Sequence, residues 1–289
     1  MRYGRALLLG GPLLWIVGAN IAPLVEMARI SLLDVYPAAP EHVSTVGFGN
    51  YATFWSSPYY VTVFLQSLLF AAATSLIALI IAYPIAYAIA LKTEPRSRLR
   101  RLWLLIAPFW TSEIVRLFAV MLLLANRGAV NGVLQGAGLV EDPLPLLYNP
   151  FSVAVGMLYV VLLAMLLPVY AAIERLSHDL LDAAAGLGAR PWRRFLCVTV
   201  PLTRDGIASG CALVFLISLG AFAVPALLGG ANATFFATTI ASLFASSAGR
   251  WPLGAAFAVI LLVSGISVAG LFVQFVAPSA ARFSGGGKG

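Results

Sequence analysis

Six long apolar segments constrain the fold of this chain more than any other feature of its sequence. Each reaches the length, about 20 residues, that an α-helix needs to cross a hydrocarbon core roughly 30 Å thick. None of them alternates apolar and polar residues as the strands of a membrane β-barrel do. The sequence therefore predicts an all-α membrane protein with six transmembrane helices. The expected spans are residues 6–25, 61–91, 102–125, 151–173, 207–228 and 253–276.

The composition excludes an ordinary soluble domain. Of the 289 residues, 61% are hydrophobic and 10% are charged, and the mean hydropathy is +0.95. Soluble domains average about 45–50% apolar and about 25% charged residues. The second segment exceeds one straight crossing, so it is expected to tilt or to extend beyond the lipid. Residues 1–22 also fit a signal peptide, but we interpret them as the first span because their removal would leave five crossings.

Basic residues alternate between the connections that join the spans. Five lie between residues 92 and 101 and five between 175 and 204, whereas the third and fifth connections hold one each. Short connections rich in Lys and Arg stay in the cytoplasm. The sequence therefore predicts a single transmembrane domain over residues 1–289, with both termini cytoplasmic and a flexible tail at 279–289. The net charge of +7 reflects this topology. It does not indicate nucleic-acid binding, because the Lys and Arg residues do not gather on one face.

The fourth connection, residues 174–201, has the most distinctive local sequence. It contains Asp182-Ala-Ala-Ala-Gly-Leu-Gly188, then nine residues, then Val198-Thr-Val-Pro201. A helical pattern covers residues 173–187, Gly188 is expected to end that helix, and Pro191 suits the first turn of the next. The sequence thus predicts two short helices on the cytoplasmic face, with a face of small alanines. Such a segment either docks a partner or merely caps the bundle.

The same segment resembles the coupling loop of permease subunits of binding-protein-dependent ABC importers. The positions that match are Asp182, Ala183, Ala184, Gly188, Val198, Val200 and Pro201. The acid in that family is more often Glu. Other motifs, between about residues 50 and 256, resemble the first permease of spermidine/putrescine importers. They include Tyr83-Pro84, Pro108-Phe-Trp-Thr-Ser112, Arg116 and Gly220-Ala-Phe-Ala-Val-Pro225.

This resemblance implies a type I ABC importer permease in the bacterial inner membrane that works by alternating access. It implies two ATPase subunits that hold ATP and Mg, a second homologous permease, and a periplasmic or lipid-anchored solute-binding protein. The chain itself would not be an enzyme and would bind no cofactor. The residues expected to contact the ATPases are Asp182, Ala183, Ala184, Gly188, Pro191 and Pro201. The sequence contains no Gly-rich phosphate loop, and its isolated His and Cys residues predict no metal site.

Glu113 and Arg116 are the charges that bear on the solute. They lie in the expected third span, three residues apart and therefore on one helical face, and charges at such depth are costly. Either Glu113 attracts a cationic solute, or the two residues only form an ion pair. The polyamine-type relatives usually have an apolar residue at the position of Glu113. Trp110 and Tyr87 are further candidates for the pathway, because ring faces attract ammonium groups, although most membrane aromatics serve in packing.

The favoured function is thus the permease subunit of an importer for a small cationic or amine-bearing solute such as a polyamine. One alternative is a secondary transporter driven by an ion gradient, for which inverted repeats and more buried carboxylates would be typical. Another is a membrane-embedded enzyme or structural subunit. An enzyme would require a clustered catalytic set, which the sequence does not show.

Overall fold

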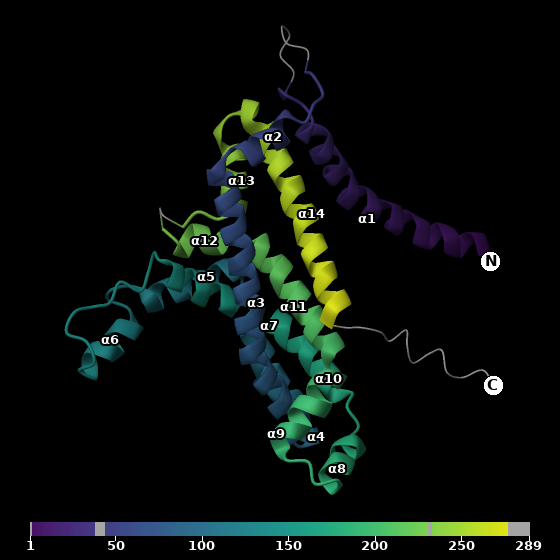
Figure 1. The fold of residues 1–289 in the computed structure, drawn as a ribbon, viewed down its shortest axis with the longest axis vertical. Coiled ribbons are helices and arrows are strands. Elements are labelled where there is room, and N and C mark those ends of the chain that lie inside the picture. The colour runs from purple at the N-terminus through teal and green to yellow at the C-terminus, as the bar shows by residue number, and fades with distance from the viewer. Residues whose placement is uncertain (1, 38–43, 231–232, 277–289) are drawn as a thin grey trace. The chain divides into compact units, whose positions relative to one another are not determined.

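The computed structural model describes residues 2–37, 44–230 and 233–276, and the chain divides into two compact units (Figure 1). Unit 1 comprises Met1–Phe64 and Phe236–Val263, and unit 2 comprises Leu65–Phe235 and Ser264–Gly289. Two long helices, α3 (Pro58–Lys92) and α14 (Trp251–Val276), contribute to both units. The tail expected at residues 279–289 lies outside the described residues.

Unit 1 is built around a cluster of aromatic rings. Its elements besides the starts of α3 and α14 are α1 (Arg2–Ser31), α2 (Gly49–Ser56), α13 (Phe236–Ser246) and the 3₁₀ turn η3 (Ala248–Arg250). The ring of Phe54 packs edge-to-face on Phe64, Phe236 and Phe257, at centroid distances of 5.6, 5.8 and 5.6 Å. Edge-to-face contacts add to the stabilisation from burial, so this cluster joins α2, α3, α13 and α14.

The chain between α1 and α2 is fastened by one aspartate. The carboxylate of Asp34 accepts hydrogen bonds from Thr45 N (2.8 Å), Thr45 Oγ1 (2.9 Å) and Val35 N (2.8 Å). An antiparallel bridge joins Leu33 to Val46 beside it. The hydrogen bonds from Thr45 lower the pKa of Asp34, because they stabilise the ionised carboxylate. These contacts hold the two ends of this connection together.

Unit 2 contains the candidate site. Its elements besides the ends of α3 and α14 are α4 (Pro95–Ile106), η1 (Ala107–Trp110), α5 (Glu113–Leu124), α6 (Ala129–Gly136), α7 (Pro150–Glu174), α8 (His178–Gly186), α9 (Pro191–Arg194), the π-helical turn η2 (Phe195–Thr199), α10 (Val200–Leu202), α11 (Arg204–Leu219) and α12 (Ala223–Leu228). The central helix α7 starts with a capping box, in which Asn149 Oδ1 accepts from Ser152 N (3.0 Å) and Ser152 Oγ accepts from Asn149 N (3.2 Å).

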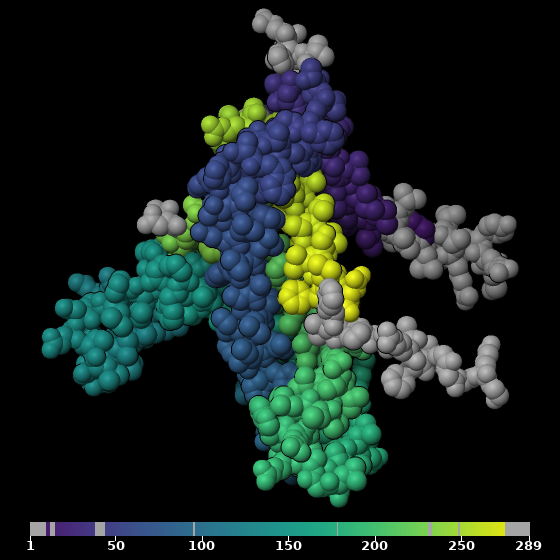
Figure 2. Space-filling model, viewed as in Figure 1, coloured from purple at the N-terminus to yellow at the C-terminus, as the bar shows by residue number. Residues whose placement is uncertain are grey.

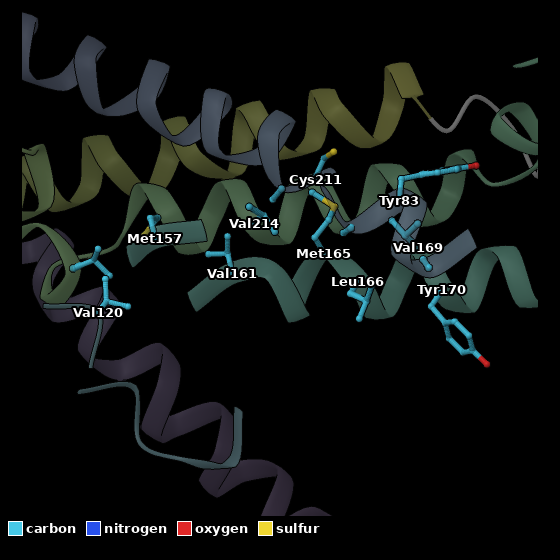
Figure 3. Packing of buried hydrophobic residues seen from close by; sticks show 14 of the residues in the cluster. Tyr83, Val120, Met157, Val161, Met165, Leu166, Val169, Tyr170, Cys211 and Val214 are labelled. Atoms are coloured by element: carbon cyan, nitrogen blue, oxygen red, sulfur yellow. The ribbon is translucent and has the colours of Figure 1, made fainter. Parts of the chain in front are cut away.

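The core of unit 2 is the contact between α7 and α11. Each helix buries a row of residues spaced by four positions, which is the ridge that packs into the groove of a neighbouring helix. On α7 the row is Val153, Met157, Val161, Met165, Val169 and Ile173, and on α11 it is Gly206, Gly210, Val214 and Ser218. Figure 3 shows part of these rows together with Tyr83 of α3. A Cβ at Gly206 would lie 2.6 Å from Pro168 O, so the glycine permits the close approach of the two helices.

The structure confirms an all-helical membrane protein with four to five apolar spans among the described residues. Four helical segments are long and apolar enough to cross a membrane: Pro58–Lys92, Glu113–Gly136, Pro150–Glu174 and Trp251–Gln274. The second of these comprises α5, α6 and the turn between them. A fifth crossing is possible if Pro191–Leu202 and Arg204–Leu219, bent by 68°, form one broken span. The 35 residues of α3 span about 52 Å at 1.5 Å per residue, as expected for a segment longer than one straight crossing.

Two expected spans are interrupted. Residues 102–125 divide among α4, η1 and α5, because Pro108 has no N–H to donate to the helical ladder and Thr111 and Ser112 are extended, with ψ of 151° and 140°. Residues 207–228 divide at Gly220, where α11 ends and α12 follows after a short break. The sequence pattern missed both breaks because the flanking residues remain apolar.

Candidate functional site

The helix boundaries in the fourth connection follow the sequence prediction closely. Ser177 caps α8, its Oγ accepting from Asp179 N at 3.2 Å. The helix ends at Gly186, and Gly188 has a φ of +79° that glycine adopts without strain. Ala189 N closes the turn by donating to Ala184 O at 3.1 Å. The predictions that Gly188 stops this helix and that Pro191 begins the next are confirmed. The helix expected over residues 173–187 is, however, broken at 175–177.

The outer surface of this segment is open. The green atoms of α8–α10 form a convex end in Figure 2. Leu187 is 89% exposed and Trp192 68% exposed, and Ala183 is exposed while Ala184 is partly buried. Asp182 is exposed, and no hydrogen bond or ion pair joins its carboxylate to another described residue. The surface therefore offers apolar side chains, small residues and one free carboxylate.

The inner side of the segment is fixed by aromatic contacts to α3. The ring of Phe195 lies 5.4 Å from Tyr83, 5.9 Å from Tyr87 and 5.7 Å from Trp192 between centroids. The hydroxyls of Tyr83 and Thr203 are hydrogen-bonded at 2.9 Å. Phe195 therefore attaches η2 to α3. The sequence pattern did not reveal this contact, because it joins rings that lie far apart in the sequence.

A π-helical turn connects this segment to α11. In η2, Val200 N donates to Phe195 O across five residues, and Pro201 follows with no N–H of its own. Because that proline cannot complete the α-helical ladder, the preceding turn widens. Pro201 therefore lies between η2 and the straight part of α11, and Pro191–Leu202 and Arg204–Leu219 meet at an angle of 68°.

Arg116 is held by aromatic rings. Its guanidinium carbon lies 4.9 Å from the Phe109 ring centroid and 5.6 Å from that of Tyr159. Its Nε and Nη1 are buried without a hydrogen-bond partner among the described residues. Glu113, at the first position of α5, is exposed. Stacking on two ring faces stabilises the cation and replaces the ion pair with Glu113 that was one expectation.

The same spacing gives an ion pair elsewhere, which shows that the difference is local. Arg29 Nη2 lies 2.6 Å from Glu26 Oε1, three residues away on α1. At Arg116 the guanidinium instead lies against the rings of Phe109 and Tyr159. The carboxylate of Glu113 therefore forms no ion pair with another described residue. The sequence places Tyr159, which contributes one of these rings, in an expected span, but its spacing does not reveal that the ring meets Arg116.

The four residues predicted for the solute pathway do not form one cluster. Trp110 is exposed and contacts Trp103 at 6.0 Å between ring centroids, close in sequence to Glu113 and Arg116. The ring of Tyr87 instead contacts Phe195 of η2, and the Lys92 ammonium lies 5.9 Å from the ring centroid of Tyr87. Their roles in the pathway remain predictions.

Comparison with known sequences gives consistent matches. The family described as binding-protein-dependent transport system inner membrane component matches residues 48–282. The spermidine/putrescine transport system permease protein PotB of Haemophilus influenzae is 37% identical over 249 residues, 86% of each chain. The inner membrane ABC transporter permease protein YdcU of Escherichia coli is 30% identical over 286 residues, covering 94% of this chain and 88% of the relative.

Solved structures agree at the level of the fold. A bacterial ABC transporter involved in the import of the acidic polysaccharide alginate contains a chain that matches with a TM-score of 0.72 and 18% sequence identity. The match covers 94% of this chain and 96% of that chain. A bacterial alginate ABC transporter in complex with an alginate pentasaccharide-bound periplasmic protein matches with a TM-score of 0.71 and 18% identity, over 94% of this chain and 95% of that chain.

Proposed function

This chain belongs to the family of binding-protein-dependent transport system inner membrane components, and on that premise we propose that it forms the membrane pathway of an importer for polyamines or similar amines. The observation that carries the substrate class is the 37% identity to a spermidine/putrescine permease over 86% of both chains. As an ABC importer permease the chain is a membrane subunit and not an enzyme.

The proposed assembly includes two ATPase subunits, a second homologous permease and a solute-binding protein outside the bacterial inner membrane. ATP and Mg would be held by the ATPase subunits alone. We place both termini of this chain in the cytoplasm with six crossings, α1 being the first and the broken helices supplying the third and fifth. The alternation of basic and nearly neutral connections supports this topology.

The proposed contact with the ATPase is formed by residues 174–201, which we call the coupling segment. Asp182, Ala183, Ala184 and Gly188 supply the docking helix and its end, and Pro191 and Pro201 limit the helices that follow. Closing of the ATPase dimer would push this segment, and the contacts of Phe195 with Tyr83 and Tyr87 would carry the push to α3. Leu180, Leu187, Trp192 and Leu196 are all exposed within these residues, which supports the assignment because apolar side chains gathered on one surface are typical of a protein contact.

Leu187→Ser tests the docking contact. Because Leu187 is 89% exposed, its loss should leave the fold of the free chain intact while it weakens copurification of the ATPase subunits. Leu139→Ser is the matched control, since Leu139 is 71% exposed in the third connection, which we place on the other side of the membrane. Equal ATPase recovery from the two variants would contradict the proposed docking site.

Glu113 is the proposed attractor of the cationic solute, with Arg116 and Trp110 positioned beside it. Since Arg116 lies against two rings, it does not occupy the carboxylate of Glu113, which is open to an ammonium group. In proteoliposomes containing the whole transporter, spermidine- or putrescine-loaded binding protein should stimulate ATP hydrolysis, and Glu113→Gln should reduce uptake. Full uptake by Glu113→Gln would remove this role, and stimulation by neither amine would refute the polyamine assignment.

A further inference from the structure

The exposed face of α4 combines arginines with large apolar side chains. At about 100° per residue, five residues share one side of the helix: Arg96, Leu99, Arg100, Trp103 and Leu104. All five are exposed, Trp103 by 53% and Leu104 by 76%. We call these five residues the α4 outer face. The transport mechanism proposed above gives none of the five a role, and only Trp103 contacts one of its residues, Trp110.

The opposite side of α4 fixes the direction of this face. Leu102 and Leu105 pack against the core cluster of unit 2. Arg98 Nε donates to Thr93 O at 3.0 Å, and Arg101 Nη1 donates to Thr93 Oγ1 at 2.9 Å. Two of the four arginines on α4 thus bind the buried Thr93, which directly follows α3, and these bonds prevent the helix from rotating its outer face inward.

Arg96 and Arg100 have no such structural task. The side chain of neither residue makes a hydrogen bond or ion pair with another described residue. Glu94 caps α4 without a side-chain hydrogen bond. They are four residues apart, hence about 6 Å along the helix axis. Between residues 92 and 104 the chain carries five basic side chains and one acid, so this region has a strong attraction for anions.

Charge and apolar surface are ordered along the helix axis. The arginines of the outer face lie in the first two turns with Leu99 between them, and only the apolar Trp103 and Leu104 follow Arg100 in the last turn. A membrane presents the same order from its phosphates to its acyl chains, with Trp enriched at the boundary between them. A docking surface for a protein would not require this gradient, so the order favours lipid as the occupant.

We propose that the α4 outer face binds the headgroups of anionic phospholipids. Arg96 and Arg100 contact the lipid phosphates, whose oxygens suit the guanidinium fork, while Trp103 and Leu104 contact the start of the acyl chains. Basic residues near an anionic membrane surface gain about 1 kcal/mol each, or about fivefold in binding. The pair should therefore favour an anionic over a zwitterionic lipid by about 30-fold.

The test uses quenching of Trp103 fluorescence by brominated lipids. The full chain is placed in bilayers that contain phosphatidylglycerol and phosphatidylcholine, with bromine on the acyl chains of one lipid at a time. The difference between the protein and Trp103→Phe isolates the signal of Trp103 from the five other tryptophans. Brominated phosphatidylglycerol should quench Trp103 more strongly than brominated phosphatidylcholine does.

Three double variants decide the outcome. In R96Q/R100Q the preference for phosphatidylglycerol should fall by about 30-fold, and R96K/R100K, which keeps both charges, should retain most of it. R127Q/R250Q is the matched control, because it removes the same charge from two other exposed arginines. Equal quenching by both lipids in the unaltered protein would overturn the proposal, as would an unchanged preference in R96Q/R100Q. Loss of ATPase subunits from that variant without a change in quenching would assign the face to a protein contact instead.

Discussion

Phe195→Ala should release the coupling segment from α3. The ring of Phe195 forms three aromatic contacts, each worth about 0.5–1.5 kcal/mol beyond burial. Truncation of a fully buried Phe costs about 3–5 kcal/mol, and Phe195 is only partly buried. We therefore expect a local loss of about 2–3 kcal/mol, which corresponds to about 30- to 150-fold faster opening of this segment.

Hydrogen exchange measured by mass spectrometry gives the direct assay. Amides of residues 191–203 should exchange faster in Phe195→Ala by this factor, because local opening governs their protection. In the assembled transporter the same variant should hydrolyse ATP while importing less solute per ATP, since the segment no longer moves α3.

Two further variants make the result interpretable. Tyr83→Phe keeps the ring contact and loses the 2.9 Å hydrogen bond to Thr203, which should cost about 0.5–1.5 kcal/mol and give a smaller effect. Phe118→Ala removes an exposed ring of α5 and should leave residues 191–203 unchanged. Unaltered exchange in Phe195→Ala, or an equal effect of Phe118→Ala, would refute the argument that this ring fastens the segment.

Three other predictions concern stability. Gly206→Ala should destabilise the chain by about 1–3 kcal/mol in detergent unfolding, because its Cβ would lie 2.4 Å from Ala172 Cβ and 2.6 Å from Pro168 O. Gly210→Ala should cost less, because its closest atom is the flexible sulfur of Met165 at 2.8 Å and the nearest backbone oxygen is 3.4 Å away; equal losses would contradict this packing. Asp34, whose pKa is lowered by Thr45, should stabilise its loop at pH values above the ordinary carboxyl pKa and lose this effect as pH falls through the lower folded value; proteolysis of the loop should then converge with that of Asp34→Asn. Asn131→Ala should expose α6 to faster hydrogen exchange, since it loses three hydrogen bonds worth about 1 kcal/mol each, and unchanged exchange would show that this side chain does not hold the helix.

Local sequence signals predicted the end of α8 and the start of α9, because each boundary depends on a single residue. Gly188 can adopt a positive φ, and Pro191 suits a first turn, so both boundaries follow from intrinsic backbone preferences. The apolar segments likewise predicted the membrane class, because length and hydropathy alone decide whether a helix can span.

Features that depend on long-range contact were not visible in the sequence. The spacing of Glu113 and Arg116 predicted a shared helical face but could not reveal that Tyr159, forty-three residues after Arg116, supplies a competing ring. The sequence likewise did not reveal the packing role of Gly206 and Gly210, because that role depends on which helix lies opposite. Pro108 alone does not show where the helix breaks, because the break also depends on the backbone conformation of Thr111 and Ser112.

The close packing of α7 on α11 has a consequence for the size of the movement that this domain can deliver. Because backbone meets backbone at Gly206, neither helix can bend or slide without separating from the other, and the pair should tilt as one lever. The 16 residues of α11 give this lever a length of about 24 Å. A tilt of only about 10° at the end near Arg204 would therefore displace the end near Leu219 by about 4 Å, which is comparable to the width of an alkyl chain.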